Sequence, residues 1–251
     1  MIRSSLALAS ALLAAAAPAS GARPPVALTA TPANVRLTGS GLAAITVANP
    51  GRAAVVVDVT RAGFSLDLRG RPRILAAAGS RGARSWLSLR PRRLALGAGE
   101  SASLLITARL PAGAEPGDHD ALVLLTTRSQ AASGVGVRMR VGVVVVVRAP
   151  GAIVHRLALQ QLTVRRLGDA RMLELLLVNR GNVTEPVGRG RLELVFMRGR
   201  RVEARLSPGP RELRPRSRGL VQVVYRGRLR GRVTVQARIG SIVRRTFRIR
   251  L

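Results

Sequence analysis

The sequence has one cluster of side chains with the chemistry to bind a metal ion or to transfer protons, Asp118-His119-Asp120. A metal site or a catalytic centre needs side chains that converge on one point. In an extended strand, however, successive side chains point to opposite faces, so the two aspartates are expected to point away from the histidine. The other histidine of the chain, His155, lies far along the sequence. We therefore interpret the cluster as a Pro-Gly-Asp turn that enters a strand, and predict no metal site there.

Other motifs of catalysis are also missing from the sequence. It has no cysteine, no Gly-x-Ser-x-Gly motif, no Gly-rich phosphate loop and no paired histidines at helical spacing. Its remaining carboxylates show no acid/base spacing, and Asn182-Val183-Thr184, which fits the glycan acceptor pattern, is interpreted as a turn. The isolated carboxylates include Asp58, Asp67, Glu100 and Glu174. We predict a protein without catalytic residues or cofactor.

The charge of the chain is very unbalanced. Its 251 residues include 42 basic and 12 acidic ones, a formal net charge of +30, and every basic residue is arginine. Complete absence of lysine is typical of coding bias in a GC-rich genome, so single arginines carry little information. Their sum creates a field that attracts polyanions in a salt-dependent way. Candidate polyanion-binding residues in the densely basic last third are Arg211, Arg214, Arg216, Arg218, Arg228 and Arg230.

The first residues predict export. Arg3 precedes an apolar run at 6–17 and small residues that end at Ala22, which is the pattern of a secretory signal peptide, with the mature chain beginning near Arg23. Export and an aromatic content of 2% argue against nucleic acid as a partner, because single-stranded nucleic acid is bound largely by aromatic stacking. An anionic cell-wall polymer or an anionic lipid surface suits the charge of an exported, cell-envelope protein better.

Period-two alternation dominates the rest of the chain. Short apolar-alternating segments separated by Gly, Pro and Asn turns, with no sustained helical spacing, predict an all-β protein of two immunoglobulin-like β-sandwiches in tandem. Pro150 and Gly151 end the longest strand, since proline cannot donate to a ladder. We predict a signal peptide at 1–22, a first sandwich at 23–149, a linker at 150–152 and a second sandwich at 153–251. The segments ITVANPG and LLLVNRG echo each other and suggest two copies of one module.

One segment resembles known envelope proteins. Residues 85–127 hold a Trp entering a strand, a Pro, a Gly-containing turn, a strand ending in Leu-Pro, and a Pro-Gly-Asp that opens the next strand. With ITVANPG, this resembles the first domain of the WxL-interacting surface proteins of Gram-positive bacteria and, more distantly, of the periplasmic pilus chaperones. The resemblance covers most of 26–147 and implies a second immunoglobulin-like domain. Pilus chaperones hold a pilin's terminal carboxylate with a paired Arg and Lys; this sequence has no Lys, so that pair is not carried over.

The segment VGVVVVVRAPG at 141–151 is apolar on both faces of a strand. Its odd positions form an unbroken core-facing row, so only Val144 and Val146 on the even face need a reason. Either they pack against a loop or the second domain, or they lie at an exposed strand edge that a partner's strand completes. Candidate partner-binding residues on this segment are Val144, Val146, Arg138, Arg140 and Arg148.

Together these patterns predict an exported, non-enzymatic cell-envelope binding or assembly module with a strongly basic surface. Its partner would be an envelope or secreted protein. The alternative is a periplasmic-type chaperone that caps secreted subunits by strand addition.

Overall fold

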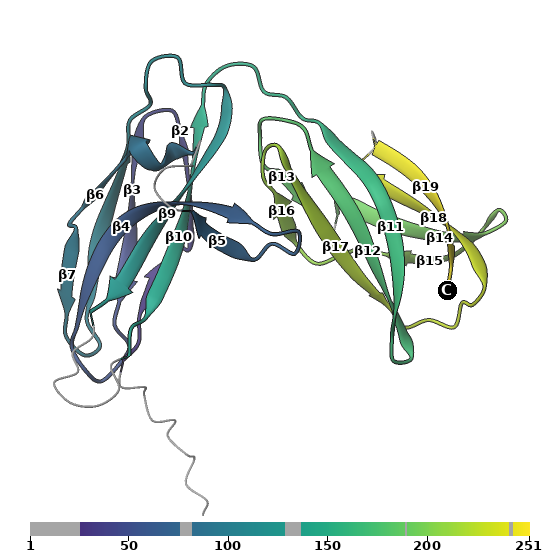
Figure 1. Ribbon diagram of the computed structural model, residues 1–251, viewed down its shortest axis with the longest axis horizontal. Coiled ribbons are helices and arrows are strands. Elements are labelled where there is room, and N and C mark those ends of the chain that lie inside the picture. The colour runs from purple at the N-terminus through teal and green to yellow at the C-terminus, as the bar shows by residue number, and fades with distance from the viewer. Residues whose placement is uncertain (1–25, 76–81, 129–136, 189, 241–242) are drawn as a thin grey trace, which may run out of the picture.

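The computed structural model describes residues 26–75, 82–128, 137–188, 190–240 and 243–251. Two β-sandwiches follow one another along the chain and meet at an angle (Figure 1). Their strands carry almost all of the regular structure, with a single short 3-10 helix, η1 (Ala83–Trp86), within the described ranges. The predicted signal peptide lies outside the described residues.

The described residues of the first sandwich form ten strands in two sheets. One sheet has the order β1-β3-β8-β6 and the other β2-β10-β9-β4-β5, with β7 also paired to β4. The strands are β1 (Thr29–Thr31), β2 (Asn34–Thr38), β3 (Gly41–Ala48), β4 (Val55–Leu66), β5 (Pro72–Leu75), β6 (Leu87–Arg90), β7 (Arg93–Leu96), β8 (Ser101–Ala108), β9 (Gly117–Thr127) and β10 (Arg140–Ala149).

The second sandwich has a four-stranded sheet, β15-β14-β18-β19, opposite a three-stranded sheet, β11-β12-β17, and a short pair, β13-β16. The strands are β11 (Leu157–Leu167), β12 (Ala170–Asn179), β13 (Glu185–Val187), β14 (Leu192–Arg198), β15 (Arg201–Leu206), β16 (Arg211–Leu213), β17 (Ser217–Tyr225), β18 (Arg232–Ile239) and β19 (Val243–Arg250).

Alternating apolar residues bury one face of each sheet, as the period-two pattern predicts. In β8 the buried row is Leu104, Ile106 and Ala108, and β18 buries every second residue from Val233 to Ile239. Each sandwich has its own core, and the two cores share no residue. The prediction of two immunoglobulin-like sandwiches is confirmed.

The echo between ITVANPG and LLLVNRG has a structural basis in two buried asparagines. Asn49 Oδ1 accepts the N–H of Gly51, and its Nδ2 donates to the carbonyl of Ala53, two and four residues further on. Asn179 makes the same two bonds, to the N–H of Gly181 and the carbonyl of Val183. The same side chain thus closes the same loop in both sandwiches, by satisfying backbone groups that would otherwise be buried without partners.

Between the sandwiches, β10 ends at Ala149 and β11 begins at Leu157. Residues 150–156 are all exposed and join the two cores. The exact domain boundaries, at 149 and 153, stay a prediction.

Candidate functional site: an open strand edge beside the cleft between the sandwiches

The valine run forms most of β10, which is paired unequally on its two sides. It pairs with β9 over its whole length, from Arg140 opposite Thr126 to Ala149 opposite Gly117. On the other side, β2 runs parallel to β10 only from Val144 to Arg148. The chain reaches β2 from β1, which belongs to the opposite sheet, so the first half of β10 is paired with no described strand on that side.

The structure decides between the two readings of Val144 and Val146. Val146 is only 2% exposed, and its cross-strand neighbours are Asp120 on β9 and Arg36 on β2, both of which form ion pairs with the second sandwich. Val144 is half-buried in a small cluster on the outer face of the sheet. The expectation of an exposed edge at these two valines is therefore wrong, because β2 occupies their edge and the sandwich junction covers Val146.

The open edge lies earlier in the strand. Val144 donates its N–H to Ala33 on the β2 side, so even-numbered residues of β10 present their backbone groups to this side. Arg140 and Gly142 have the same orientation but lie beyond the end of β2. Their N–H and C=O groups point to an edge with no pairing strand among the described residues.

An apolar row accompanies this open edge. Val137 is 54% exposed, and Met139 and Val141 are half-buried against the edge of the first core. They continue the odd-numbered row that begins in the core with Val143. Val135, which the alternation also predicts in this row, lies outside the described residues.

The three arginines predicted to bind a partner have different environments. Arg138 and Arg140 are exposed beside the open edge, within the described residues near its start. Arg148, at the other end of β10, is held by Asp118, with Nε to Oδ1 at 2.6 Å and a second guanidinium nitrogen to Oδ2 at 3.1 Å. The structure does not bring the three together.

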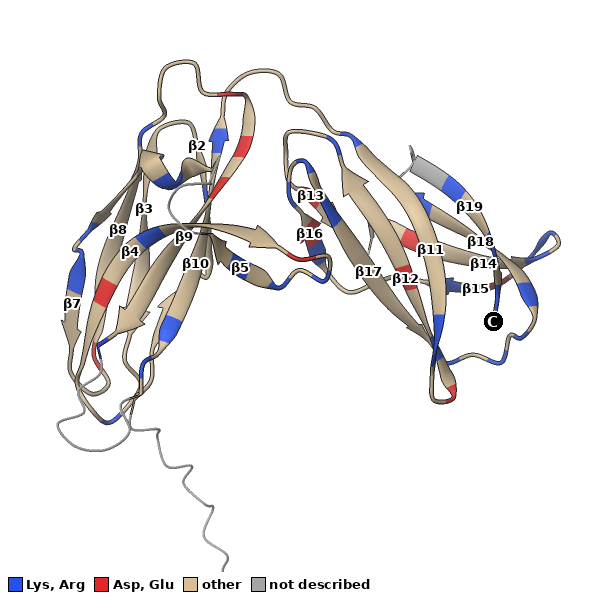
Figure 2. Ribbon diagram, viewed as in Figure 1, with Lys and Arg blue, Asp and Glu red and all other residues tan. Residues whose placement is uncertain are grey.

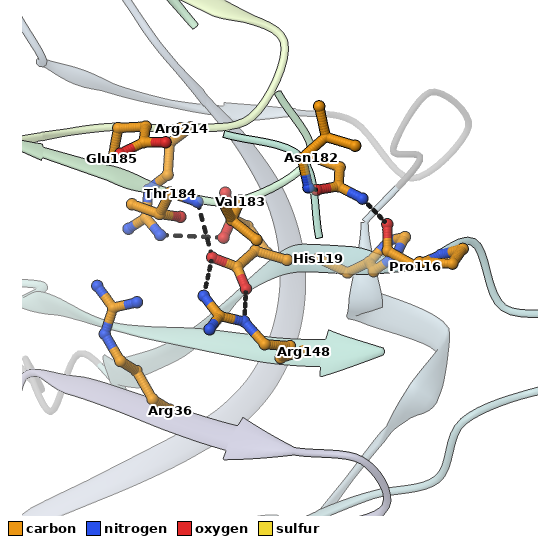
Figure 3. Close-up of polar contacts among 12 residues, drawn as sticks. Arg36, Pro116, His119, Arg148, Asn182, Val183, Thr184, Glu185 and Arg214 are labelled. Carbon is orange, nitrogen blue, oxygen red and sulfur yellow. Dashed lines mark hydrogen bonds and ion pairs between the residues drawn. The ribbon is translucent and has the colours of Figure 1, made fainter. Parts of the chain in front are cut away.

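Asp118 joins three parts of the chain at the cleft (Figure 3). Besides Arg148, its carboxylate accepts the N–H of Thr184 at 2.8 Å, and its own N–H donates to the carbonyl of Asn182. Burial by itself would raise the pKa of Asp118, but the hydrogen bonds from Arg148 and Thr184 outweigh burial and hold the pKa below its usual value. Asp118 therefore stays ionised and links the two sandwiches.

Asp120 forms the neighbouring link, with Arg214 of the second sandwich at 3.0 Å. Here burial dominates and raises the pKa of Asp120 to about 6, although the Arg214 guanidinium opposes the shift. The carboxylates of Asp118 and Glu212 add to the rise and Arg36 opposes it. This junction thus contains a carboxyl group that changes charge in mildly acidic solution.

The side chain of Asn182 fastens the connecting segment. Its Nδ2 donates to the carbonyls of Pro116 and Ala152, and its Oδ1 accepts the N–H of Val154. Figure 3 shows its contact with the carbonyl of Pro116, apart from the Arg148 contact. The turn interpretation of Asn182-Val183-Thr184 agrees with this position, because Nδ2, the atom that would carry a glycan, is committed to two hydrogen bonds.

A hairpin makes a separate contact across the cleft. The β4–β5 hairpin projects from the first sandwich toward β17 (Figure 1), and the carbonyl of Leu68 at its tip accepts the N–H of Leu220. Arg211 donates to the carbonyls of both Leu68 and Leu220. Asp67 stabilises the tip by accepting the N–H groups of Arg69 and Arg71.

The six arginines predicted to bind a polyanion are divided by the fold. Arg211, Arg214 and Arg216 belong to the junction, since Arg216 pairs with Glu115 and the other two make the contacts described above. Arg218, on β17, and Arg228 and Arg230, between β17 and β18, are exposed. Half of the six thus satisfy acceptors of the first sandwich, and polyanion binding by any of the six stays a prediction. The density of arginines in the sequence does not indicate which of them have such long-range partners.

The Asp118-His119-Asp120 segment alternates as expected for a strand. Both aspartates contact the second sandwich, whereas His119 packs on the Trp86 ring, with centroids 4.5 Å apart, and its Nε2 lies 2.6 Å from the carbonyl oxygen of Glu115. A pocket of about 390 Å³ lies beside them, lined by Gly63, Phe64, Leu75, Gly82, Glu115, Pro116, Asp118, His119, Asp120, Asn182, Pro215 and Arg216.

The described ranges contain no group of three or more His, Cys, Asp or Glu side chains that could hold a metal ion. In the same ranges, no helix has the length and apolar character to cross a membrane.

Sequence reasoning missed Arg36, Thr184 and the junction role of Arg214. The one available signal was that Asp118 and Asp120 share a face and carry charge in a chain with few acids. That signal shows that cations must lie nearby, but not which of the 42 they are.

No protein-family model matches this chain, and no curated protein matches it. Among solved structures, it is similar to the class 5 fimbriae chaperone CfaA, with 12% identity and a TM-score of 0.49 over 90% of this chain and 100% of that one. It is also similar to the E. coli chaperone DraB, with 13% identity and a TM-score of 0.44 over 90% and 99% of the two chains. The Pseudomonas aeruginosa CupB2 chaperone matches at 16% identity and a TM-score of 0.39, over 89% and 100%. These similarities concern the fold, and none of the comparisons supports the WxL-interacting type.

Proposed function

We propose that this chain is an exported, non-enzymatic binding protein that captures a segment of an envelope or secreted protein by strand addition to the open edge of β10. Of the two functions suggested by the sequence, this is the chaperone-like alternative. The observation that carries it is the backbone of Arg140 and Gly142, to which no described strand pairs on this side, beside the apolar row of Val137 and Met139. An added strand would gain affinity from main-chain hydrogen bonds and selectivity from alternate side chains.

The position of the added strand follows from that of β2. A segment placed in line with β2 would continue the sheet β2-β10-β9-β4 toward the start of β10. It would also cover the half-buried side chains of Met139 and Val141, whose burial adds apolar stabilisation.

The arginines of the cleft are already paired, which argues for partner capture at β10 and not in the cleft. Arg36, Arg148 and Arg214 each already pair with a carboxylate of the chain itself. A partner's terminal carboxylate would have to displace one of these acids. We therefore assign the cleft to holding the two sandwiches at a defined angle, and assign partner capture to β10.

Proline substitution tests the edge. Arg140→Pro removes an N–H that points to the open side, whereas Val141→Pro removes one that faces β9. Proline is tolerated on a strand whose N–H faces outward. The native partner is first identified in the host, by a crosslinker placed at Val137, and then purified. Arg140→Pro should keep a thermal midpoint close to that of the unchanged protein but lose binding of this partner. Val141→Pro should unfold the first sandwich.

Arg140→Ala is the matched control, because it removes the same side chain and keeps the N–H. Capture by Arg140→Pro at the level of Arg140→Ala would refute strand addition at this edge. Amide exchange gives a second measurement: Arg140 and Gly142 should gain protection in the complex, while Val141 and Val143 are protected before it forms.

A further inference from the structure

A second surface feature lies on the four-stranded sheet of the second sandwich. A groove of about 530 Å³ opens where the start of β18 and the end of β19 meet the β14–β15 turn. Four exposed arginines line it, Arg198, Arg232, Arg248 and Arg250, together with Met197, Gly199, Val233, Thr234 and Ile249. None of these lining residues is acidic. Figure 2 shows basic residues at the β14–β15 turn.

The strand register places these charges against one another. Arg232 lies directly opposite Arg250, and Arg248 lies opposite Thr234 on the same face, two residues along each strand. Like charges directly opposite in an antiparallel pair repel and destabilise the pairing. The free chain therefore pays an electrostatic cost at this end of the sheet.

No acidic side chain in the described part of the chain offsets that cost by an ion pair. None of the ion pairs there includes any of the four arginines, and the one hydrogen bond among them joins Arg198 to the carbonyl of Arg230 at 2.9 Å. By contrast, Arg205 on the neighbouring β15 pairs with Glu193 of β14 at 3.1 Å. The four arginines that line the groove thus lie close together without an acidic side chain paired to any of them.

We propose that this groove binds a phosphate group of an anionic ligand. A single carboxylate would neutralise only one of the four cations, whereas a phosphate carries up to two charges and accepts hydrogen bonds in several directions. Guanidinium groups match phosphate oxygens with paired, charge-assisted hydrogen bonds. The site lies on the second sandwich and does not involve β10, so it is independent of partner capture.

The test uses the double variant Arg232→Gln, Arg248→Gln. Its control is Arg166→Gln, Arg218→Gln, which removes the same charge from exposed positions on β11 and β17, in the other sheet. Binding of tripolyphosphate is measured by titration calorimetry at about 0.15 M ionic strength, where the diffuse field of the protein is screened beyond about 8 Å. The groove variant should bind at least about tenfold more weakly than the unchanged protein, and the control about equally well.

Stability without ligand gives a second readout. Because the groove variant removes repulsion between opposed arginines, it should fold with a thermal midpoint equal to or above that of the unchanged protein. Equal weakening in both double variants would mean binding by total charge and would overturn the proposal, as would absence of tripolyphosphate binding by the unchanged protein. A markedly lower midpoint for the groove variant alone would also contradict it, since the repulsion would then not exist.

Vesicles distinguish the source of the phosphate. If it belongs to a lipid headgroup, vesicles of 30% phosphatidylglycerol in phosphatidylcholine should bind the unchanged protein and the control but not the groove variant. If only tripolyphosphate shows this dependence on the groove, the ligand is a soluble or polymeric phosphate.

Discussion

Asp120 on β9 and Arg214 before β17 join the two sandwiches by an ion pair of 3.0 Å, although 94 residues separate them in the chain. Next to it, Asp118 binds Arg148 of its own sandwich and the backbone of Thr184 in the other. The two aspartates are adjacent on one face of β9, yet burial raises the pKa of one and hydrogen bonds lower that of the other. The junction therefore combines a permanent link with one that depends on pH.

The raised pKa of Asp120 predicts a specific dependence of stability on pH. Its pKa is about 6 in the folded chain and about 4 when unfolded, so the folded state binds the proton more tightly. This contribution to stability is present in full below pH 4 and is lost as the pH rises through 6. It amounts to about 3 kcal/mol, at 1.4 kcal/mol for each pH unit of the shift. Urea denaturation between pH 4 and 7 should show this slope, and Asp120→Asn should abolish it.

An equal slope in the unchanged protein and in Asp120→Asn would assign the dependence to another group. Protonation of Asp120 has a second effect: it stabilises the folded chain but removes the ion pair with Arg214 that joins the two sandwiches. Small-angle scattering should therefore detect a looser angle between the sandwiches at pH 5 than at pH 7.

The buried asparagines predict a shared requirement in the two sandwiches. Asn179→Ala would leave the carbonyls of Val183 and Leu213 without their side-chain donor, at a cost of about 1–3 kcal/mol for each unsatisfied group. Asn49→Ala should cost a similar amount in the first sandwich, and exposed Asn34→Ala should change the free energy of unfolding by less than about 0.5 kcal/mol. Urea denaturation followed at Trp86 for the first sandwich and by circular dichroism for the whole chain measures these losses.

The double variant Val144→Thr, Val146→Thr should be less stable than the unchanged protein when no partner is present. At Val146 the change places a hydroxyl in a site that is 2% exposed, which costs about 1–3 kcal/mol unless a hydrogen bond forms. The single variant Val144→Thr, at a half-buried position, should cost less. A double variant with an unchanged thermal midpoint would show that this face is accessible to solvent.

The exposed connection at 150–156 predicts the result of limited proteolysis. Elastase, which cleaves after small residues, should cut within this exposed connection and yield two fragments that each resist further cleavage. Mass spectrometry of the fragments tests the predicted domain boundaries.

The predicted signal peptide is tested by mass spectrometry of the intact protein from its native host. The mature chain should begin near Arg23, and retention of Met1 would argue against export.

The sequence by itself determined the architecture of this protein, because a strand buried on one face must alternate. The rows in β8 and β18, and the two Asn-x-Gly turns, depend only on residues a few positions apart, and local spacing is visible in one dimension. It also indicated that β10 is unusual, since Val144 and Val146 break the alternation of its outer face.

What covers that face was decided by tertiary structure alone. Val146 is buried because Asp120 and Arg36 beside it bind residues of the second sandwich, and these pairings depend on the angle between the sandwiches. The open edge lies at Arg140 and Gly142 instead of Val144 and Val146, because the chain passes from one sheet to the other between β1 and β2. No local sequence pattern indicates this change of sheet. Likewise, arginines that are alike in sequence became junction contacts or groove residues according to whether the fold placed an acid within reach.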